Sequence, residues 1–136
     1  MMRIPLGIFI ILIFFAGCTP QTSLTHRWTD LNPQEAQALL ETKDRIYLFV
    51  LNVHTPYQGK IEGTDAIIED WQNITVNKDQ LPQDLHQPIL VYCRTGRMST
   101  SAVAQLQDLG YKNIYHLKGG MIAWDQAGLP LVDKAW

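Results

Sequence analysis

The sequence has few cysteines and histidines, no basic run and no repeat, and these absences exclude several classes of protein. Its two cysteines and four histidines lie scattered, without the spacing of metal ligands, so no metal or other cofactor is expected. The 11 lysines and arginines form no cluster and are outnumbered by 13 acidic residues, which argues against a nucleic-acid partner. The 136 residues show no internal repeat or low-complexity tract and leave no room for a second domain.

The first residues indicate a targeting signal rather than part of a fold. Arg3 gives a positive start, residues 4–16 are almost wholly apolar, and small residues stand directly before Cys18. The apolar run is shorter than the ~20 residues that cross a bilayer. We predict that residues 1–17 are a signal peptide and that residues 18–27, which carry no acidic side chain, are a flexible tether.

This signal resembles that of a bacterial lipoprotein, in which the peptide is cleaved before the cysteine and the cysteine carries the lipid. The resemblance implies that Cys18 is lipidated and holds the domain at the periplasmic, non-cytoplasmic face of a membrane. Thr19 rather than aspartate follows the cysteine, which points to the outer membrane if the source is Gram-negative. An uncleaved anchor and an ordinary secretory signal are the alternatives.

Residues 28–136 have the length of one domain, and their patterns alternate between strand and helix. Helices are expected from Pro33 to about Glu41, from near Ser99 to Gly110, and between Gly120 and Gly128. Strands are expected at residues 46–53, 66–68, 89–92 and 114–116, while residues 70–85 are polar with weak helical signals. This alternation with short turns is typical of an α/β fold with a parallel sheet and helices on both faces.

Cys93 opens the run CRTGRMS between a predicted buried strand and a predicted helix. The start of that helix presents unpaired backbone N–H groups and the positive end of its dipole, and Arg94 and Arg97 add two charges. Such surroundings bind anions and favour the nucleophilic thiolate of a cysteine. With Cys18 lipidated, Cys93 also has no partner for an internal disulfide. The pattern favours an exposed anion site, with a buried structural cysteine as the alternative.

Several motifs between Ile89 and Leu131 occur together in a known order. They are the apolar strand before the cysteine, the CRTGRMS loop, a helix ending in LQDLGY, the strand NIYHLKGG and a last helix with Trp124 before GLPL. This stretch resembles a rhodanese domain, of the sulfurtransferase family. The resemblance implies a three-layer α/β fold with a central parallel sheet, a catalytic Cys93, and a substrate-binding loop of Arg94, Thr95, Gly96, Arg97, Met98 and Ser99.

By this resemblance the Cys93 thiolate takes the outer sulfur of a donor such as thiosulfate and passes it on through a persulfide. The expected partners are therefore a small anionic sulfur donor and a cyanide or thiol acceptor, and the sequence does not identify any protein partner. Backbone N–H groups of the loop and the two arginines are expected to stabilise the developing charge, with Arg97 standing nearest the helix start. Ser99 is expected to cap the helix.

The N-terminal half departs from the family pattern and leaves other functions open. Asn52 and His54 stand where rhodanese domains carry aspartate and arginine, and Lys60 replaces a family histidine. We interpret His54 as a structural or exposed residue in preference to a titrating rim residue. One alternative function is a sulfur-carrying or binding module without turnover. Another is a cysteine phosphatase, which needs an arginine six residues after the cysteine, where this chain has Ser99.

Overall fold

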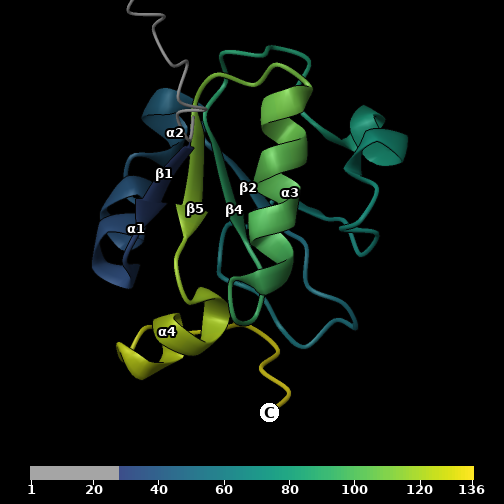
Figure 1. Ribbon diagram of the computed structural model, residues 1–136. Helices are drawn as coiled ribbons and strands as arrows, with labels where there is room; N and C mark the ends of the chain where they lie inside the picture. The colour runs from purple at the N-terminus through teal and green to yellow at the C-terminus, as the bar shows by residue number, and fades with distance from the viewer. Residues whose placement is uncertain (1–27) are drawn as a thin grey trace, which may run out of the picture.

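The computed structural model describes residues 28–136, which form a five-stranded sheet with the strand order β1-β5-β4-β2-β3 (Figure 1). All four strand pairings are parallel. The strands are β1 Trp28–Leu31, β2 Phe49–Asn52, β3 Ala66–Ile67, β4 Ile89–Tyr92 and β5 Ile114–Leu117. The helices are α1 Pro33–Leu40, α2 Lys43–Ile46, the 3-10 helix η1 Ile74–Gln80, α3 Arg97–Asp108 and α4 Gly120–Gln126. Cys18 and the predicted signal peptide lie outside the described residues.

Hydrophobic side chains on the two faces of the sheet form two separate cores. The central strand β4 is buried along its whole length, as expected for a parallel strand covered on both faces. Ile89 and Val91 contribute to the core beneath α3 and η1, whereas Leu90 and Tyr92 contribute to the core with α1 and α4. Figure 1 shows α3 lying in front of the sheet. The three layers confirm the predicted α/β fold with helices on both faces.

The first helix begins where the sequence predicts. The Asn32 side chain accepts a hydrogen bond from the Glu35 N–H, and the Glu35 carboxylate accepts one from the Asn32 N–H. These reciprocal bonds satisfy two backbone donors at the start of α1. The helix ends at Leu40, so the expected boundaries of Pro33 and about Glu41 are confirmed.

Two other segments differ from the prediction. The strand predicted over residues 46–53 begins only at Phe49, because residues 43–46 form α2 and Tyr47 ends it in the left-handed region at φ 55°. The sequence does not predict β1, since Thr29 and Asp30 are exposed and break the apolar run by which the other strands are recognised. In residues 28–136 none of the helices combines the length and apolar character needed to cross a membrane.

Parallel strands bring their carboxyl ends to one edge of the sheet, and the segment after β4 lies at that edge next to α4 (Figure 1). The Met121 N–H donates to the Cys93 carbonyl and the Ile122 N–H to the Arg94 carbonyl, both at 2.9 Å. First-turn N–H groups of a helix have no partner within the helix. The start of α4 therefore holds the backbone of the loop that follows β4.

Tyr92, at the end of β4, anchors a second segment beside the same loop. Its hydroxyl accepts a hydrogen bond from the Ile61 N–H at 3.0 Å and lies 2.7 Å from Thr64 Oγ1. Burial raises the pKa of Tyr92 to about 12, so the hydroxyl keeps its proton at neutral pH. The phenol thus ties residues 61–64 to the strand that ends immediately before Cys93.

Candidate active site

Cys93 follows β4 on the face of the sheet that α3 covers, and only 1% of the residue is exposed. Its Sγ accepts a hydrogen bond from the Gly96 N–H at 3.1 Å and from Ser99 Oγ at 3.3 Å. Both donors are aimed at the sulfur, an arrangement suited to one that carries negative charge. The burial corrects the expectation of an exposed site, because the loop turns back over the sulfur and both donors pack against it.

Gly96 makes that turn possible. It precedes the first residue of α3 with φ 97°, in the left-handed region that favours glycine. A Cβ at this position would stand 3.4 Å from the Gly119 nitrogen, an ordinary contact, so the backbone conformation rather than a collision favours glycine. Because the helix starts at Arg97, Ser99 is its third residue and does not cap it, contrary to the prediction. Ser99 is fully buried and faces the sulfur instead.

The hydrogen bonds continue from Ser99 to two residues on neighbouring strands. Ser99 Oγ lies 2.8 Å from His116 Nε2, and His116 Nδ1 lies 2.9 Å from Asp30 Oδ1. Sequence reasoning did not single out either residue. The pattern of β5 carried one signal, because His116 stands two residues from the buried Ile114 on the same face. A buried histidine needs hydrogen-bond partners.

The two arginines of the loop lie against different tryptophans. The Arg94 guanidinium carbon is 5.1 Å from the Trp136 ring centroid, and that of Arg97 is 5.9 Å from the Trp71 ring centroid. Both distances are within the range of a cation–π contact. Arg94 Nε is buried and has no hydrogen-bond partner within the described part of the chain. The two positive charges of the loop are therefore held against different aromatic rings.

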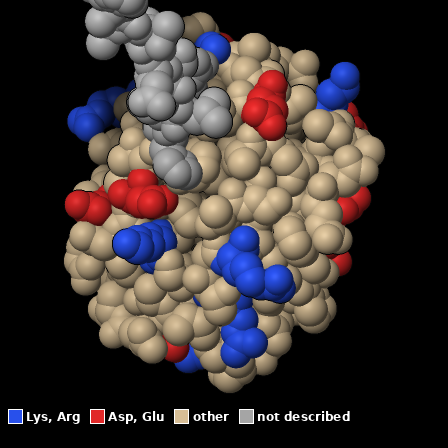
Figure 2. Space-filling model, in the orientation of Figure 1, with Lys and Arg blue, Asp and Glu red and all other residues tan. Residues whose placement is uncertain are grey.

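The other predicted loop residues have different surroundings. Thr95 is exposed, and Met98 is half-buried and packs against the core that contains Cys93. A cavity of about 510 Å³ borders the loop and is lined by residues that include Gly96, Arg97 and Lys118. In Figure 2, blue side chains gather at the lower centre, over the end of the molecule where α3 begins. Arg97 and Lys118 line the cavity together with one carboxylate, Asp30, so its lining carries a net positive charge that suits a small anion.

Asn52 and His54 have structural contacts beyond the end of β2. Asn52 is fully buried, donates through Nδ2 to the Gly59 carbonyl at 3.1 Å, and accepts from the His54 N–H at 2.9 Å. His54 is 7% exposed, and its Nε2 lies 2.7 Å from Gln58 Oε1. These bonds stabilise the turn over residues 53–59, which agrees with the structural interpretation of His54.

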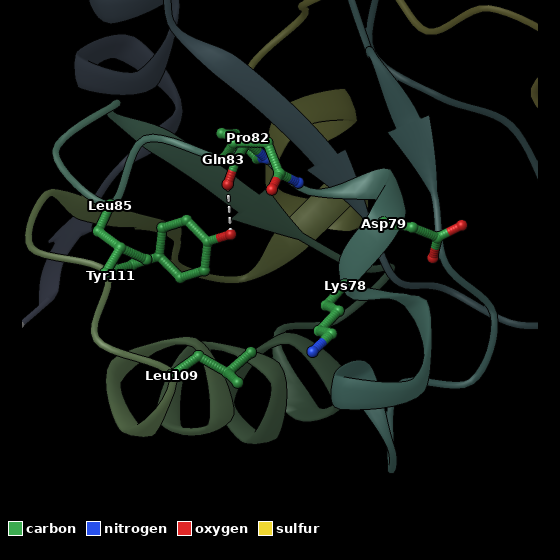
Figure 3. A pocket seen from close by; sticks show the side chains of 7 residues that line it. All are labelled: Lys78, Asp79, Pro82, Gln83, Leu85, Leu109 and Tyr111. Atoms are coloured by element: carbon green, nitrogen blue, oxygen red, sulfur yellow. Dashed lines mark hydrogen bonds between the residues drawn. The ribbon is translucent and has the colours of Figure 1, made fainter.

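A second cavity, of about 450 Å³, lies between η1 and the far end of α3 (Figure 3). Leu109 and Tyr111 line one side of it and Lys78 lines the other, while Tyr111 donates a hydrogen bond to the Pro82 carbonyl at 2.6 Å. Its lining contains no cysteine or histidine. Residues 28–136 also contain no cluster of three metal-ligating side chains.

Residues 32–127 match a family model of rhodanese-like domains, a span of most of the chain. The chain belongs to the rhodanese-like family. A sulfurtransferase of Allochromatium vinosum is 34% identical to it over 100 residues, which cover 71% of this chain and 87% of the relative. The thiosulfate sulfurtransferase GlpE of Actinobacillus succinogenes is 28% identical over 104 residues, which cover 76% of this chain and 90% of the relative.

A solved structure of a rhodanese-related protein from Thermoplasma volcanium has the same fold, with a TM-score of 0.61 at 25% identity. The match covers 78% of this chain and 99% of that one. The rhodanese resemblance is therefore confirmed over most of the domain, including the N-terminal half that departs from the family pattern. The family match begins at Asn32, so Asp30, the partner of His116, stands just before it.

Proposed function

We propose that this rhodanese-like domain transfers sulfane sulfur from a small anionic donor to a thiol or cyanide through a persulfide on Cys93. The observation that carries the proposal is the pair of donors, the Gly96 N–H and Ser99 Oγ, that point at the Cys93 sulfur. Relatives named sulfurtransferase and thiosulfate sulfurtransferase support the same activity.

The reaction consists of two displacements at sulfur. In the first, the Cys93 thiolate attacks the outer sulfur of thiosulfate, a new S–S bond forms, and sulfite leaves with the electron pair of the old bond. In the second, cyanide attacks the outer sulfur of the persulfide, a C–S bond forms, and the S–S bond breaks with its electron pair on the Cys93 sulfur, which releases thiocyanate. The second step regenerates the Cys93 thiolate, so no external oxidant or reductant is consumed.

The persulfide is the species to detect. After incubation of the purified protein with thiosulfate, mass spectrometry should find one added sulfur on the peptide that contains Cys93. Subsequent cyanide should remove it and release thiocyanate. A persulfide that forms but is not discharged would favour the sulfur-carrier alternative, and no added sulfur would reject both. Hydrolysis of a phosphate ester would favour a phosphatase, although Ser99 occupies the position of the arginine that such enzymes need.

Arg97 is proposed to hold the anionic donor and to stabilise negative charge on the sulfur. Arg97→Ala should lower the second-order rate with thiosulfate by about tenfold to a hundredfold, because a hydrogen bond to a charged group contributes about 1.5–3 kcal/mol. The variant also loses the contact with Trp71. Steady-state kinetics measure the rate, and alkylation of Cys93 by iodoacetamide across pH measures ionisation of the thiol.

Arg45→Ala is the matched control, since it removes an exposed arginine from α2. It should keep the wild-type rate. If Arg97→Ala loses only turnover with thiosulfate, Arg97 binds the donor and does not influence the thiol. If Arg97→Ala keeps both the wild-type turnover with thiosulfate and the wild-type alkylation profile of Cys93, the role proposed for Arg97 is wrong.

We also propose that a lipid on Cys18 holds the domain at the periplasmic face of a membrane. Cys18→Ser should move the protein from the membrane fraction to the soluble fraction or leave it unprocessed. Mass spectrometry of the membrane-bound protein should find a lipid on Cys18. An unmodified Cys18 in that fraction would contradict the proposal.

A further inference from the structure

Four side chains from different parts of the fold form a continuous hydrogen-bonded chain that begins at Cys93. Ser99 Oγ lies 3.3 Å from Cys93 Sγ and 2.8 Å from His116 Nε2, and His116 Nδ1 lies 2.9 Å from Asp30 Oδ1. Cys93, Ser99 and His116 are buried, whereas the Asp30 side chain is 52% exposed. The chain therefore connects the buried sulfur with a carboxylate that contacts solvent.

Regular secondary structure holds each member of this chain in place. Asp30 and His116 are Cα partners in the β1–β5 ladder, and His116 pairs with Val91 of β4. Cys93 stands two residues after Val91 and packs in the same core, so it projects from the same face of the sheet. Ser99 comes from α3, which covers that face. The relative positions of the four groups thus follow from strand register and helix packing.

The hydrogen-bonding capacity of the side chains decides where the protons lie. An ionised Asp30 carboxylate only accepts hydrogen bonds, so His116 Nδ1 carries a proton and Nε2 of the neutral ring accepts one. When Cys93 is a thiol, the Ser99 hydroxyl can donate to that nitrogen while its oxygen accepts from the S–H group; when Cys93 is a thiolate, the same hydroxyl donates to the sulfur. The neutral arrangement is therefore ready to pass a proton from Cys93 toward His116.

We propose that Ser99, His116 and Asp30 form a proton relay that takes up the thiol proton of Cys93. The S–H bond breaks and its proton passes to Ser99 Oγ, while the hydroxyl proton of Ser99 passes to His116 Nε2. The products are a Cys93 thiolate, a neutral Ser99 and a protonated His116 that donates to Asp30. His116 and Asp30 act through Ser99, so they are positioning residues rather than groups that touch the substrate.

The charges around the relay show why Asp30 is central to it. Arg97 and Lys118 line the same cavity as His116 and oppose a positive charge on its ring, while Arg94 lies on the other side of the loop. Asp30 is the only carboxylate among the residues, all within 28–136, that line this cavity. Its charge therefore offsets the neighbouring cations and stabilises the protonated His116.

The test is to follow ionisation of Cys93 by the ultraviolet absorbance of its thiolate as a function of pH, with Cys93→Ser as the background. This readout needs no reagent to reach the buried sulfur. Asp30→Asn keeps an acceptor for His116 Nδ1 but removes the charge. It should raise the pH at which half of Cys93 is ionised by about one unit. Ser99→Ala interrupts the relay and should shift the curve in the same direction.

Asp108→Asn is the matched control, because it removes an exposed carboxylate at the last residue of α3 and should leave the curve unchanged. An unchanged curve for Asp30→Asn would overturn the relay and leave Ser99 as a simple hydrogen-bond donor. A shift with Asp30→Asn but none with folded Ser99→Ala would also overturn it, since charge alone would then act on the sulfur. If circular dichroism shows that Ser99→Ala is unfolded, the ionisation curve of Asp30→Asn alone decides whether the relay stands.

The relay rests on the proposed function in one respect only: the proposed function makes the Cys93 thiolate the nucleophile of sulfur transfer. The absorbance measurement contains no sulfur donor or acceptor, so its result is independent of sulfur transfer. A chain that shows the expected shifts and forms no persulfide would reject the proposed function and keep the relay. If the protein forms and discharges a persulfide but the ionisation curves of the variants do not shift, the proposed function stands and the relay is rejected.

Discussion

Cys93→Ser should abolish sulfur transfer from thiosulfate to cyanide, with a loss of about a thousandfold or more. The persulfide requires a sulfur nucleophile, and a serine hydroxyl does not ionise at neutral pH, so the first displacement has no substitute group. The substitution replaces sulfur by the smaller oxygen in a fully packed position, and the fold should remain intact. Colorimetric detection of thiocyanate measures the activity, and thermal unfolding confirms the fold.

Cys18→Ser is the matched control for this result, because it removes the other cysteine, which lies outside the described residues. It should transfer sulfur at the wild-type rate in detergent-free solution or in the membrane fraction. Equal activity of Cys93→Ser and the wild-type chain would mean that another group carries the sulfur. In that case the assignment of the active site would be wrong.

Gly120→Ala should both destabilise the domain and disturb the loop. A Cβ at this position would stand 2.6 Å from the Arg94 carbonyl carbon and also collide with the Cys93 carbonyl oxygen, and both are backbone atoms. The residue also has φ 60°, in the left-handed region. Overpacking costs about 1–3 kcal/mol and the left-handed conformation about 1–2 kcal/mol, so the free energy of unfolding should fall by about 2–5 kcal/mol. Denaturant titration measures the fall.

Gly128→Ala separates the two contributions. Gly128 has φ 77°, and a Cβ there would meet no atom within 4 Å, so it experiences the conformational cost without the collision. Its free energy of unfolding should fall by only about 1–2 kcal/mol, and sulfur transfer should remain. If the two variants are equally stable and equally active, α4 does not constrain the loop in the way the contacts indicate.

The main elements of the fold could be predicted because their patterns are local. The buried strand at Ile89–Tyr92 shows as an apolar run, and the start of α1 shows in the capping residues Asn32 and Glu35. Strand β1 could not be predicted, because its four residues pair with β5 across more than 80 residues of sequence. Only the tertiary structure makes Thr29 and Asp30 part of a sheet.

The candidate site could be predicted as far as it is contiguous in the sequence. Cys93, Gly96 and the flanking arginines belong to one short loop, and the family resemblance identifies that loop. The orientation of Ser99 depends on where α3 begins, and a left-handed glycine sets that start. The partnership of His116 with Asp30 depends on the register between two strands, which no local pattern specifies.

The contact between α4 and the loop has a consequence for amide hydrogen exchange. The N–H groups of Met121 and Ile122 are bonded to the carbonyls of Cys93 and Arg94, not to carbonyls of their own helix. Their exchange with deuterium therefore requires the loop and the helix to separate, whereas first-turn amides that lack such a partner are not protected by the helix at all. These two amides are natural probes of loop opening, and any binding event that closes the loop over Cys93 should slow their exchange without a label near the sulfur.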